Sequence, residues 1–192
     1  MSIELPLPIG DFDAYLFDCD GTIADTMPLH FQGWQHVLSH WNCKFEPELF
    51  YAWGGIPVGK IVEMLNERNG LRMPVDEVMQ RKEEFFLTAI HQVQAIPSVV
   101  THIERQHGKI PLAVVSGGPR DTVKRTLEVL KLLDRFATIV GAEDYSRGKP
   151  DPEPFLTAAH RLGVAPEKCL VFEDAELGIQ SAKAAGMAYV KV

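Results

Sequence analysis

Five short runs of apolar residues constrain the fold of this 192-residue chain more than any other feature of its sequence. Most of them are rich in branched side chains and have no polar face. Runs of this kind are typical of strands that are buried on both faces in a parallel sheet, because helices cover such a sheet above and below. The runs cover residues 14–17, 112–115, 138–140, 169–172 and 187–192.

Helical patterns fill the sequence between the later runs. One begins near Pro119, and a second follows Asp151, an expected N-cap, with Pro152 in its first turn. A third covers residues 175–185 and stops at Gly186, the type of residue that most often ends a helix. The alternation of strands and helices predicts an α/β fold with a doubly wound parallel sheet.

The segment 26–95 interrupts this alternation, because it holds helical patterns with no strand between them. The patterns cover residues 28–41, 47–53, 58–69 and 75–93. We therefore expect two units: an α/β core domain formed by residues 1–25 and 96–192, and an inserted helical cap domain formed by residues 26–95. Residues 25–27 and 95–97 would form the two hinge strands between them.

The net charge excludes one class of function. The chain carries 19 Lys and Arg residues against 26 Asp and Glu residues, which gives a formal net charge of −7 at pH 7. Sequence-independent nucleic-acid binding depends on Lys and Arg side chains that neutralise phosphates, so an acidic chain is a poor candidate for it. A small phosphorylated metabolite is compatible with this charge, since one local cluster of cations is enough to hold it.

The cysteines and the hydropathy pattern indicate a cytoplasmic protein. Cys19, Cys43 and Cys169 are odd in number and lack metal or redox spacing, so we expect free thiols in a reducing compartment. No apolar run approaches the ~18 residues of a membrane span. The segment 1–10 has no basic residue, so we expect no secretory signal. We also expect a monomer that binds neither membranes nor nucleic acid.

Side chains that can carry chemistry follow the predicted strands, at the edge of a parallel sheet where ligands bind. They are Asp18 and Asp20 after the first run, Ser116 after the second, Lys149 in the loop after the third, and Glu173 and Asp174 after the fourth. Each has an ordinary alternative: a turn for the first pair, a helix cap for Ser116, a solvated loop lysine for Lys149 and a helix start for the last pair. A calcium loop is excluded, because Gly21 comes too early and Leu29 occupies the twelfth position.

Taken together, these groups suit phosphoryl transfer. A carboxylate such as Asp18 can attack phosphorus and form an acyl phosphate. Repulsion between carboxylate and phosphate, about 4 kcal/mol per contact at an effective dielectric of about 20, calls for a divalent cation such as Mg²⁺. Lys149 and Ser116 would then bind the phosphoryl oxygens. Asp20 would protonate the leaving oxygen and later deprotonate water, and we expect neighbouring carboxylates to raise its pKa.

Four segments resemble, in order, the motifs of the haloacid dehalogenase (HAD) superfamily. They are Asp18-Cys19-Asp20-Gly21-Thr22, Val114-Val115-Ser116-Gly117, Lys149-Pro150 and Phe172-Glu173-Asp174. The helical insertion is similar to the cap of the subgroup that holds β-phosphoglucomutase and the small sugar-phosphate phosphatases. The resemblance implies a Rossmann-like catalytic core, with Asp18 as the nucleophile and Asp20 as the acid/base. It also implies Mg²⁺ held by Asp18, the Asp20 backbone carbonyl and Asp174, with Glu173 beside it, and a phosphate bound by Ser116, Gly117 and Lys149.

The same resemblance points to further residues on the substrate side. His30 matches a cap histidine that reaches the acid/base aspartate when the cap closes, and Lys82 matches a cap lysine that faces the substrate. Gly55 would bring backbone close to the bound sugar, and Arg120 is the one residue that could supply a cation near Ser116. The alternatives are a surface histidine for His30 and the charged outer face of a helix for Lys82.

Two departures from the resembling mutases favour hydrolysis of a monophosphate. Val58 stands where those mutases have an arginine that grips a second phosphate, and Gly117-Gly118-Pro119-Arg120 replaces a more polar set. We therefore expect a Mg²⁺-dependent phosphatase of sugar phosphates such as fructose 1-phosphate, which works through an aspartyl phosphate. The alternatives are a hexose-phosphate mutase with the same fold and, from another class, a phospho-accepting signalling domain. A domain of the latter kind needs neither Asp20 nor the insertion, since it keeps its acyl phosphate.

Overall fold

The computed structural model describes residues 5–192. Residues 1–4 lie outside the described residues. They include the start of the segment 1–10, for which no secretory signal is expected, and the start of the predicted core range 1–25. Among the described residues, no helix is both long and apolar enough to cross a membrane. Cys19, Cys43 and Cys169 are free and buried.

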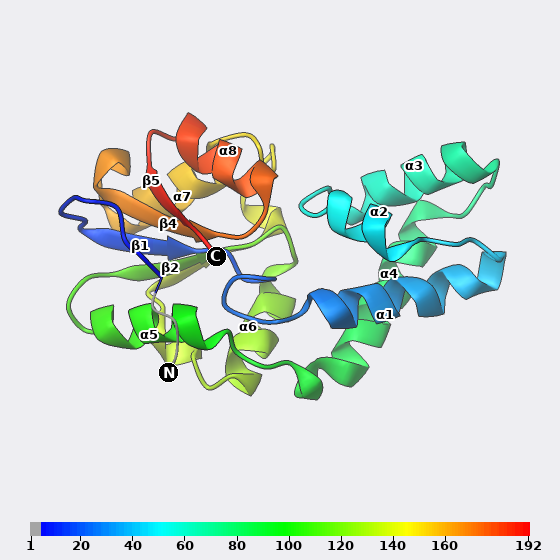
Figure 1. Cartoon of the computed structure of the whole chain (residues 1–192), viewed down its shortest axis with the longest axis horizontal. Coiled ribbons are helices and arrows are strands. Elements are labelled where there is room, and N and C mark those ends of the chain that lie inside the picture. The colour runs from blue at the N-terminus through cyan, green and yellow to red at the C-terminus, as the bar shows by residue number, and fades with distance from the viewer. Residues whose placement is uncertain (1–4) are drawn as a thin grey trace.

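A five-stranded sheet, in which all neighbouring strands are parallel, lies at the centre of the larger lobe (Figure 1). The strands are β1 (Ala14–Phe17), β2 (Leu112–Val115), β3 (Thr138–Val140), β4 (Cys169–Glu173) and β5 (Ala188–Lys191). Their order in space is β3-β2-β1-β4-β5, so β1 lies in the middle with β2 and β4 on either side. The predicted doubly wound α/β fold is confirmed.

The alternation of side chains along β1 explains why helices cover both faces of the sheet. Tyr15 and Phe17 belong to a buried cluster with residues of α5 (Pro97–Gln106) and α6 (Arg120–Val129). Ala14 and Leu16 belong to a second cluster, with residues of α7 (Glu153–Leu162) and α8 (Glu176–Ala184). All four residues of β1 are buried. The strand that leads into the candidate site is therefore fixed from both sides.

Between β1 and α5 the chain forms a second lobe of helices, drawn on the right of Figure 1. The helices are α1 (Met27–Leu38), α2 (Pro47–Ala52), α3 (Val58–Asn69) and α4 (Val75–Ala89). They share a buried cluster of their own, which includes Trp34 from α1, Phe50 from α2, Leu65 from α3 and Val78 from α4. The division of the chain into domains at 25/26 and 95/96 stays a prediction.

The helix bounds follow the sequence patterns with small shifts at several ends. The pattern at residues 75–93 is α-helical only to Ala89 and continues as a 3-10 turn, Ile90–Gln92. Val93 is extended and belongs to a buried cluster with Phe86. α7 begins at Glu153, one residue later than expected, and the Asp151 carboxylate accepts a hydrogen bond of 3.0 Å from the Glu153 N–H.

Two short segments connect the lobes side by side. Ala24 and Ala95 form an isolated antiparallel bridge, and backbone hydrogen bonds of 2.8 and 2.9 Å join the neighbouring residues on either side. The predicted hinge ranges reach too far along the chain, because Met27 and Pro97 already begin α1 and α5.

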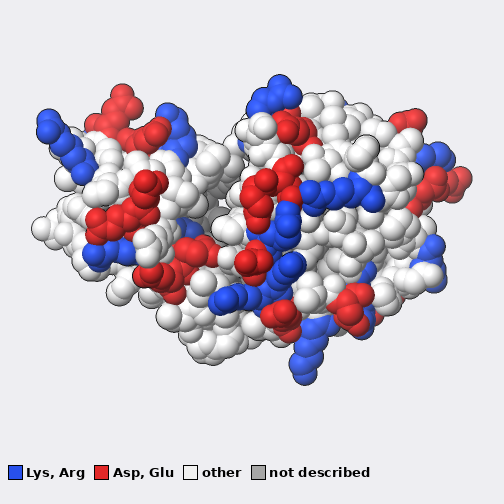
Figure 2. Space-filling view, turned by 180° about the vertical axis from the view of Figure 1, so that it is seen from behind, with Lys and Arg blue, Asp and Glu red and all other residues white. Residues whose placement is uncertain are grey.

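Figure 2 shows the molecule from behind, with a hollow between the two lobes. Acidic and basic side chains are intermixed on this face, over the described residues that the view shows. It therefore lacks the wide basic surface that follows a nucleic-acid backbone.

Candidate active site

Asp18, Ser116 and Glu173 come together because they end three neighbouring strands. Asp18 follows β1 directly, and its N–H donates to the Phe172 carbonyl at 3.0 Å, so the pairing of β1 with β4 continues past the strand. Ser116 follows β2, and Glu173 is the last residue of β4. All three side chains are buried. The sheet thus gathers two carboxylates and a hydroxyl at one edge, as the sequence predicts.

The Lys149 ammonium lies among these groups. It donates to Asp18 Oδ1 at 2.6 Å, to Glu173 Oε2 at 2.7 Å and to the Val115 carbonyl at 3.2 Å. These three bonds use every donor that an ammonium has. The Lys149 side chain is only 9% exposed, so the alternative of a solvated loop lysine is wrong.

Burial and charge shift the pKa values in this group. Burial alone would lower the pKa of Lys149, but the charges of Asp18 and Glu173 and their hydrogen bonds outweigh burial and raise it. Burial raises the pKa of Asp18 well above its usual range, and repulsion from Glu173 adds to the rise, against the attraction of Lys149. One ammonium therefore serves two buried carboxylates. The excess of negative charge favours a bound cation.

Asp18, Glu173 and Asp174 could hold a metal ion. Each offers one carboxylate oxygen, and these oxygens lie within 4.8 Å of one another. Such oxygens are the ligands that Mg²⁺ and Ca²⁺ take in proteins. The Thr22 hydroxyl donates to Asp174 Oδ1 at 3.0 Å and fixes it. Gly21 leaves room for the same carboxylate, since it has a φ of +87° and a Cβ there would lie 2.8 Å from Asp174 Cγ.

Asp20 accepts hydrogen bonds from three side chains. Its Oδ1 accepts from the Thr26 hydroxyl at 2.7 Å and from His30 Nε2 at 3.2 Å, and its Oδ2 accepts from the Ser116 hydroxyl at 3.4 Å. Burial raises the pKa of Asp20, but the hydrogen bonds from His30 and Thr26 and the positive charge of Lys82 outweigh burial and lower it to about 2. The expected rise is wrong for this arrangement, because hydrogen-bond donors and a cation surround Asp20 rather than carboxylates.

His30 and Lys82 extend this network into the helical lobe. Lys82 Nζ lies 3.2 Å from His30 Nδ1. Because an ammonium can only donate, Nδ1 must accept, and His30 carries its proton on Nε2, which donates to Asp20. The His30 ring also stacks on Phe86, with ring centroids 4.5 Å apart. Both surface alternatives are wrong, since Lys82 is 6% exposed and the His30 side chain 18%.

Burial also governs the charge of this pair. Burial lowers the pKa of Lys82. Burial and the nearby charge of Lys82 also lower the pKa of His30, although the hydrogen bond between His30 and Asp20 acts in the opposite direction. Besides His30, the Lys82 ammonium contacts the Trp34 ring, at 5.7 Å from the centroid. Within residues 5–192 no carboxylate forms an ion pair with it. A buried lysine without such a pair is costly to keep, which points to a function.

Ser116 shapes the loop after β2 as well as contacting Asp20. The Gly118 N–H donates to its Oγ at 3.0 Å, and the Tyr145 hydroxyl donates to its carbonyl at 3.1 Å. A Cβ on Gly117 would meet nothing within 4 Å. The space beside Gly117 is therefore open to a ligand.

Gly55 and Arg120 lie further out. Gly55, in the loop between α2 and α3, has a φ of +85°, and a Cβ there would lie 3.4 Å from Leu177 Cβ, so this loop lies against the start of α8. The Arg120 guanidinium pairs with Asp144, which also accepts from Arg161 at 2.6 Å. Among the contacts within residues 5–192, none joins Arg120 to Asp18, Asp20, Glu173 or Asp174. Substrate binding by Arg120 and by Gly55 stays a prediction.

Sequence reasoning placed Thr22 in the first motif and Thr26 in a hinge segment, but assigned no function to their hydroxyls. Both are fully buried, and their hydroxyls hold Asp174 and Asp20. A threonine just before a helix usually caps it through its hydroxyl, but Thr26 makes no side-chain cap bond to α1. The only hint in the sequence is that Thr26 lies six residues after Asp20. The burial of Thr26, which turns its hydroxyl to Asp20, is not visible in the sequence.

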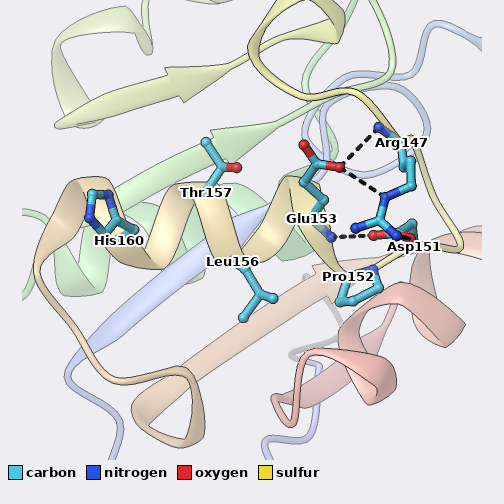
Figure 3. A pocket seen from close by; sticks show the side chains of 7 residues that line it. All are labelled: Arg147, Asp151, Pro152, Glu153, Leu156, Thr157 and His160. Atoms are coloured by element: carbon cyan, nitrogen blue, oxygen red, sulfur yellow. Dashed lines mark hydrogen bonds and ion pairs between the residues drawn. The ribbon is translucent and has the colours of Figure 1, made fainter.

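A hollow of about 360 Å³ on α7 is lined by none of the candidate-site side chains described above (Figure 3). It is lined by Arg147, Asp151, Pro152, Glu153, Leu156, Thr157 and His160. Arg147 is already paired there, through Nε with Glu153 at 3.3 Å and through Nη1 with Asp151 at 3.3 Å. The hollow is an ion-paired surface rather than part of the candidate site.

Comparison with known proteins gives three findings that cover most of the chain. A family model described as haloacid dehalogenase-like hydrolase matches residues 15–192. The fructose-1-phosphate phosphatase YqaB of Escherichia coli (strain K12) is 35% identical over 178 residues, which are 92% of this chain and 94% of that protein. The β-phosphoglucomutase of Bacillus subtilis (strain 168) is 32% identical over 190 residues, covering 93% of this chain and 82% of that protein.

A solved structure also matches the fold. The crystal structure of β-phosphoglucomutase from Clostridium difficile has a TM-score of 0.84 to this chain and covers 93% of it and 83% of its own length. At 22% sequence identity, this likeness shows a shared fold.

Proposed function

The chain belongs to the haloacid dehalogenase-like hydrolases, and we propose that it is a Mg²⁺-dependent phosphatase of small sugar monophosphates that works through an aspartyl phosphate on Asp18. Its family and its relatives make it a hydrolase of phosphate monoesters, with sugar phosphates as the substrate class. The observation that carries the proposal is the buried Lys149 ammonium between Asp18 and Glu173, at the ends of adjacent parallel strands.

The proposed reaction has two displacements at phosphorus. A carboxylate oxygen of Asp18 attacks phosphorus, the bond from phosphorus to the sugar oxygen breaks, and the sugar oxygen takes a proton from Asp20. Water then attacks the same phosphorus, the bond to Asp18 breaks, and Asp20 takes the proton from water. With a pKa of about 2, Asp20 is ionised without substrate and ready for the second step. The charge of a bound phosphate raises that pKa, which prepares Asp20 to carry the proton for the first step.

The groups around Asp18 stabilise the phosphoryl oxygens. Lys149 gives up one of its present acceptors and donates to a phosphoryl oxygen, and the Ser116 hydroxyl and the Gly117 N–H bind others. Asp18, the Asp20 carbonyl and Asp174 would hold Mg²⁺, with Glu173 beside it, and the donor chemistry of the carboxylates fits that ion. When bound, Mg²⁺ supplies positive charge that offsets the repulsion between phosphate and carboxylates.

The helical lobe acts as the cap that supplies sugar specificity in this proposal. Lys82 and His30 give it a positive charge and a donor above Asp20. The loop Gly54-Gly55-Ile56-Pro57-Val58 carries no charged side chain. This loop therefore offers no second clamp for a phosphate, and fructose 1-phosphate, the substrate named for the Escherichia coli relative, is our first candidate. We also infer a cytoplasmic enzyme, because its free cysteines suit a reducing compartment.

Released phosphate tests the proposal directly. The purified protein is assayed with Mg²⁺ against a panel of ketose and aldose monophosphates, with and without a chelator in excess. We expect phosphate release from at least one sugar monophosphate, its loss in chelator and its return when Mg²⁺ is added back. Full turnover in chelator would contradict the Mg²⁺ dependence, and no release across the panel would contradict the phosphatase.

The mutase remains the second candidate because of the 32% identical β-phosphoglucomutase. Product analysis with β-glucose 1-phosphate and a catalytic amount of a glucose bisphosphate distinguishes the mutase from the phosphatase. We expect inorganic phosphate and negligible glucose 6-phosphate, because the loop 54–58 offers no charged group to hold the second phosphate of a bisphosphate. Efficient conversion to glucose 6-phosphate without phosphate release would replace the phosphatase by the mutase. A stable acyl phosphate on Asp18 would instead favour the signalling domain.

A further inference from the structure

Glu173 is the buried partner that keeps Lys149 in place. Its side chain is 2% exposed, its Oε2 accepts from Lys149 at 2.7 Å, and its Oε1 accepts from the Ala175 N–H at 3.1 Å. When Asp18 becomes an acyl phosphate it loses its negative charge, and Lys149 then keeps only Glu173 and the Val115 carbonyl as protein acceptors. The position of the Glu173 carboxylate therefore decides where the ammonium lies during the second displacement.

Gly178 occupies the place next to this carboxylate. It lies in the first turn of α8 and is buried. A Cβ on Gly178 would lie 2.5 Å from Glu173 Cγ and closer still to the carboxylate carbon and oxygen. Non-bonded contacts of a real Cβ are almost never shorter than 3.0 Å. The Glu173 side chain thus fills the space that a side chain at position 178 would need.

The backbone conformation of Gly178 does not call for glycine. Its φ lies outside the left-handed region, unlike that of Gly21 or Gly55. Within a helix, alanine is more favourable than glycine. The glycine is therefore unfavourable for α8 by itself, and its proximity to Glu173 is what gives it a reason.

We propose that Gly178 is a positioning residue, whose missing side chain lets Glu173 hold Lys149 at Asp18. The expected effect on activity rests on the proposed phosphatase function, in which Lys149 binds the phosphate. The Glu173 carboxylate cannot move aside freely, since its backbone is part of β4 and both of its oxygens already accept hydrogen bonds. A Cβ at position 178 displaces it and breaks the buried pair with Lys149.

A double-mutant cycle with Gly178→Ala and Glu173→Ala tests the inference, because it asks whether the glycine acts only through the glutamate. In the wild-type background we expect Gly178→Ala to lower kcat about 10²-fold, the scale of a misplaced catalytic group. In the Glu173→Ala background the same change should leave kcat within about twofold, since no carboxylate remains to be displaced. An equal loss in both backgrounds, or no loss in the wild type, would overturn the proposal.

Thermal unfolding gives a readout that does not depend on the phosphatase. We expect Gly178→Ala to lower Tm in the wild-type background and to raise it in the Glu173→Ala background, where only the better helix former counts. If Gly178→Ala does not fold, the double variant should restore folding, and its failure to fold would refute the inference. Gln180→Ala, at an exposed position of α8, is the control and should change neither Tm nor kcat. Absence of activity in the wild type would contradict the proposed function alone, since the Tm cycle still decides on Gly178.

Discussion

Lys149 has no hydrogen-bond donor to spare in the structure described here. Its three N–H groups go to Asp18, Glu173 and the Val115 carbonyl. A phosphate can therefore bind to it only by replacing one of these acceptors. In the proposed reaction Asp18 is the acceptor that Lys149 loses, because the attack of Asp18 on phosphorus would remove its charge. Binding and chemistry are coupled in this way at a single ammonium.

At the residue scale we expect Asp18→Asn to abolish turnover without unfolding the protein. An amide is a poor nucleophile, so kcat should fall by at least about 10³-fold. Since burial and Glu173 raise the pKa of Asp18, its ionised form is unfavourable in the fold, and Tm should stay the same or rise. Steady-state kinetics and thermal unfolding of the same preparation check both effects. A folded variant with wild-type turnover would refute Asp18 as the nucleophile.

Lys82→Met should lower kcat by about 10- to 10²-fold, with little change in Tm. The ammonium fixes the proton of His30 on Nε2, so without it the histidine no longer donates reliably to Asp20. A methionine fills similar volume, and removing a buried charge that has no carboxylate partner costs little stability. Lys60→Met is the matched control, since Lys60 is exposed and pairs with Glu63 on its own helix. A loss of Tm as large as that expected of a core variant would mean that Lys82 serves the fold instead.

At the scale of elements, the sequence predicted most where the pattern was local. The strands, α3 and the gathering of Asp18, Ser116 and Glu173 follow from short apolar runs and from parallel strands that end at one edge. The pKa of Asp20 did not follow, because it depends on Thr26 and on His30 and Lys82, which lie on helices of the other lobe. Contacts between distant segments determine that value, and no spacing in the sequence displays them.

One element contact should make stability depend on pH. Asp144 joins the start of α6 to the end of α7, because it pairs with Arg120 and with Arg161. The hydrogen bond from Arg161 lowers the pKa of Asp144 most, and the Gly141 N–H and Arg120 lower it further. Together they outweigh burial and hold this pKa below the usual range. The carboxylate is thus more acidic folded than unfolded, where a pKa of about 3.9 applies. Its contribution is present above about pH 4 and is lost as the pH falls further.

Asp144→Asn should therefore lower the free energy of unfolding by about 1–3 kcal/mol at pH 7. The difference from the wild type should shrink as the pH is lowered below about 4. Denaturant titrations across this range measure it. Glu77→Gln, which removes an exposed i, i+4 pair with Arg81, should change stability by less than about 0.5 kcal/mol. A difference that grows on acidification would contradict the role given to Asp144.

At the scale of the whole molecule, the two lobes touch at several separate points. The Thr122 hydroxyl of α6 donates to the Glu83 carboxylate of α4. The loop at Gly55 lies against Leu177, and His30 bonds Asp20. These contacts join the helical lobe to the α/β lobe, and we interpret the arrangement as a closed one.

Thr122→Val should weaken this closure without touching the chemistry. One lost hydrogen bond of about 1 kcal/mol corresponds to roughly a fivefold rise in KM for a sugar phosphate. A small aryl phosphate, which makes few contacts with the helical lobe, should show no such rise. Thr88→Val is the control, because its hydroxyl bonds a carbonyl of its own helix. Equal effects on both substrates would place the role of Thr122 in the α/β lobe alone.

The bridge between Ala24 and Ala95 has a consequence for how such a chain can be rebuilt. Neighbouring strands lie about 5 Å apart, a gap that a linker of two or three residues can close. The intervening helices therefore leave and rejoin the α/β lobe at almost the same point, and their length places no demand on the order of the strands. A different helical segment could be spliced in there by recombination while Asp18, Lys149 and Glu173 keep their places. If the helical lobe selects the substrate as proposed, the bridge lets that lobe be exchanged without changing the residues of the candidate site.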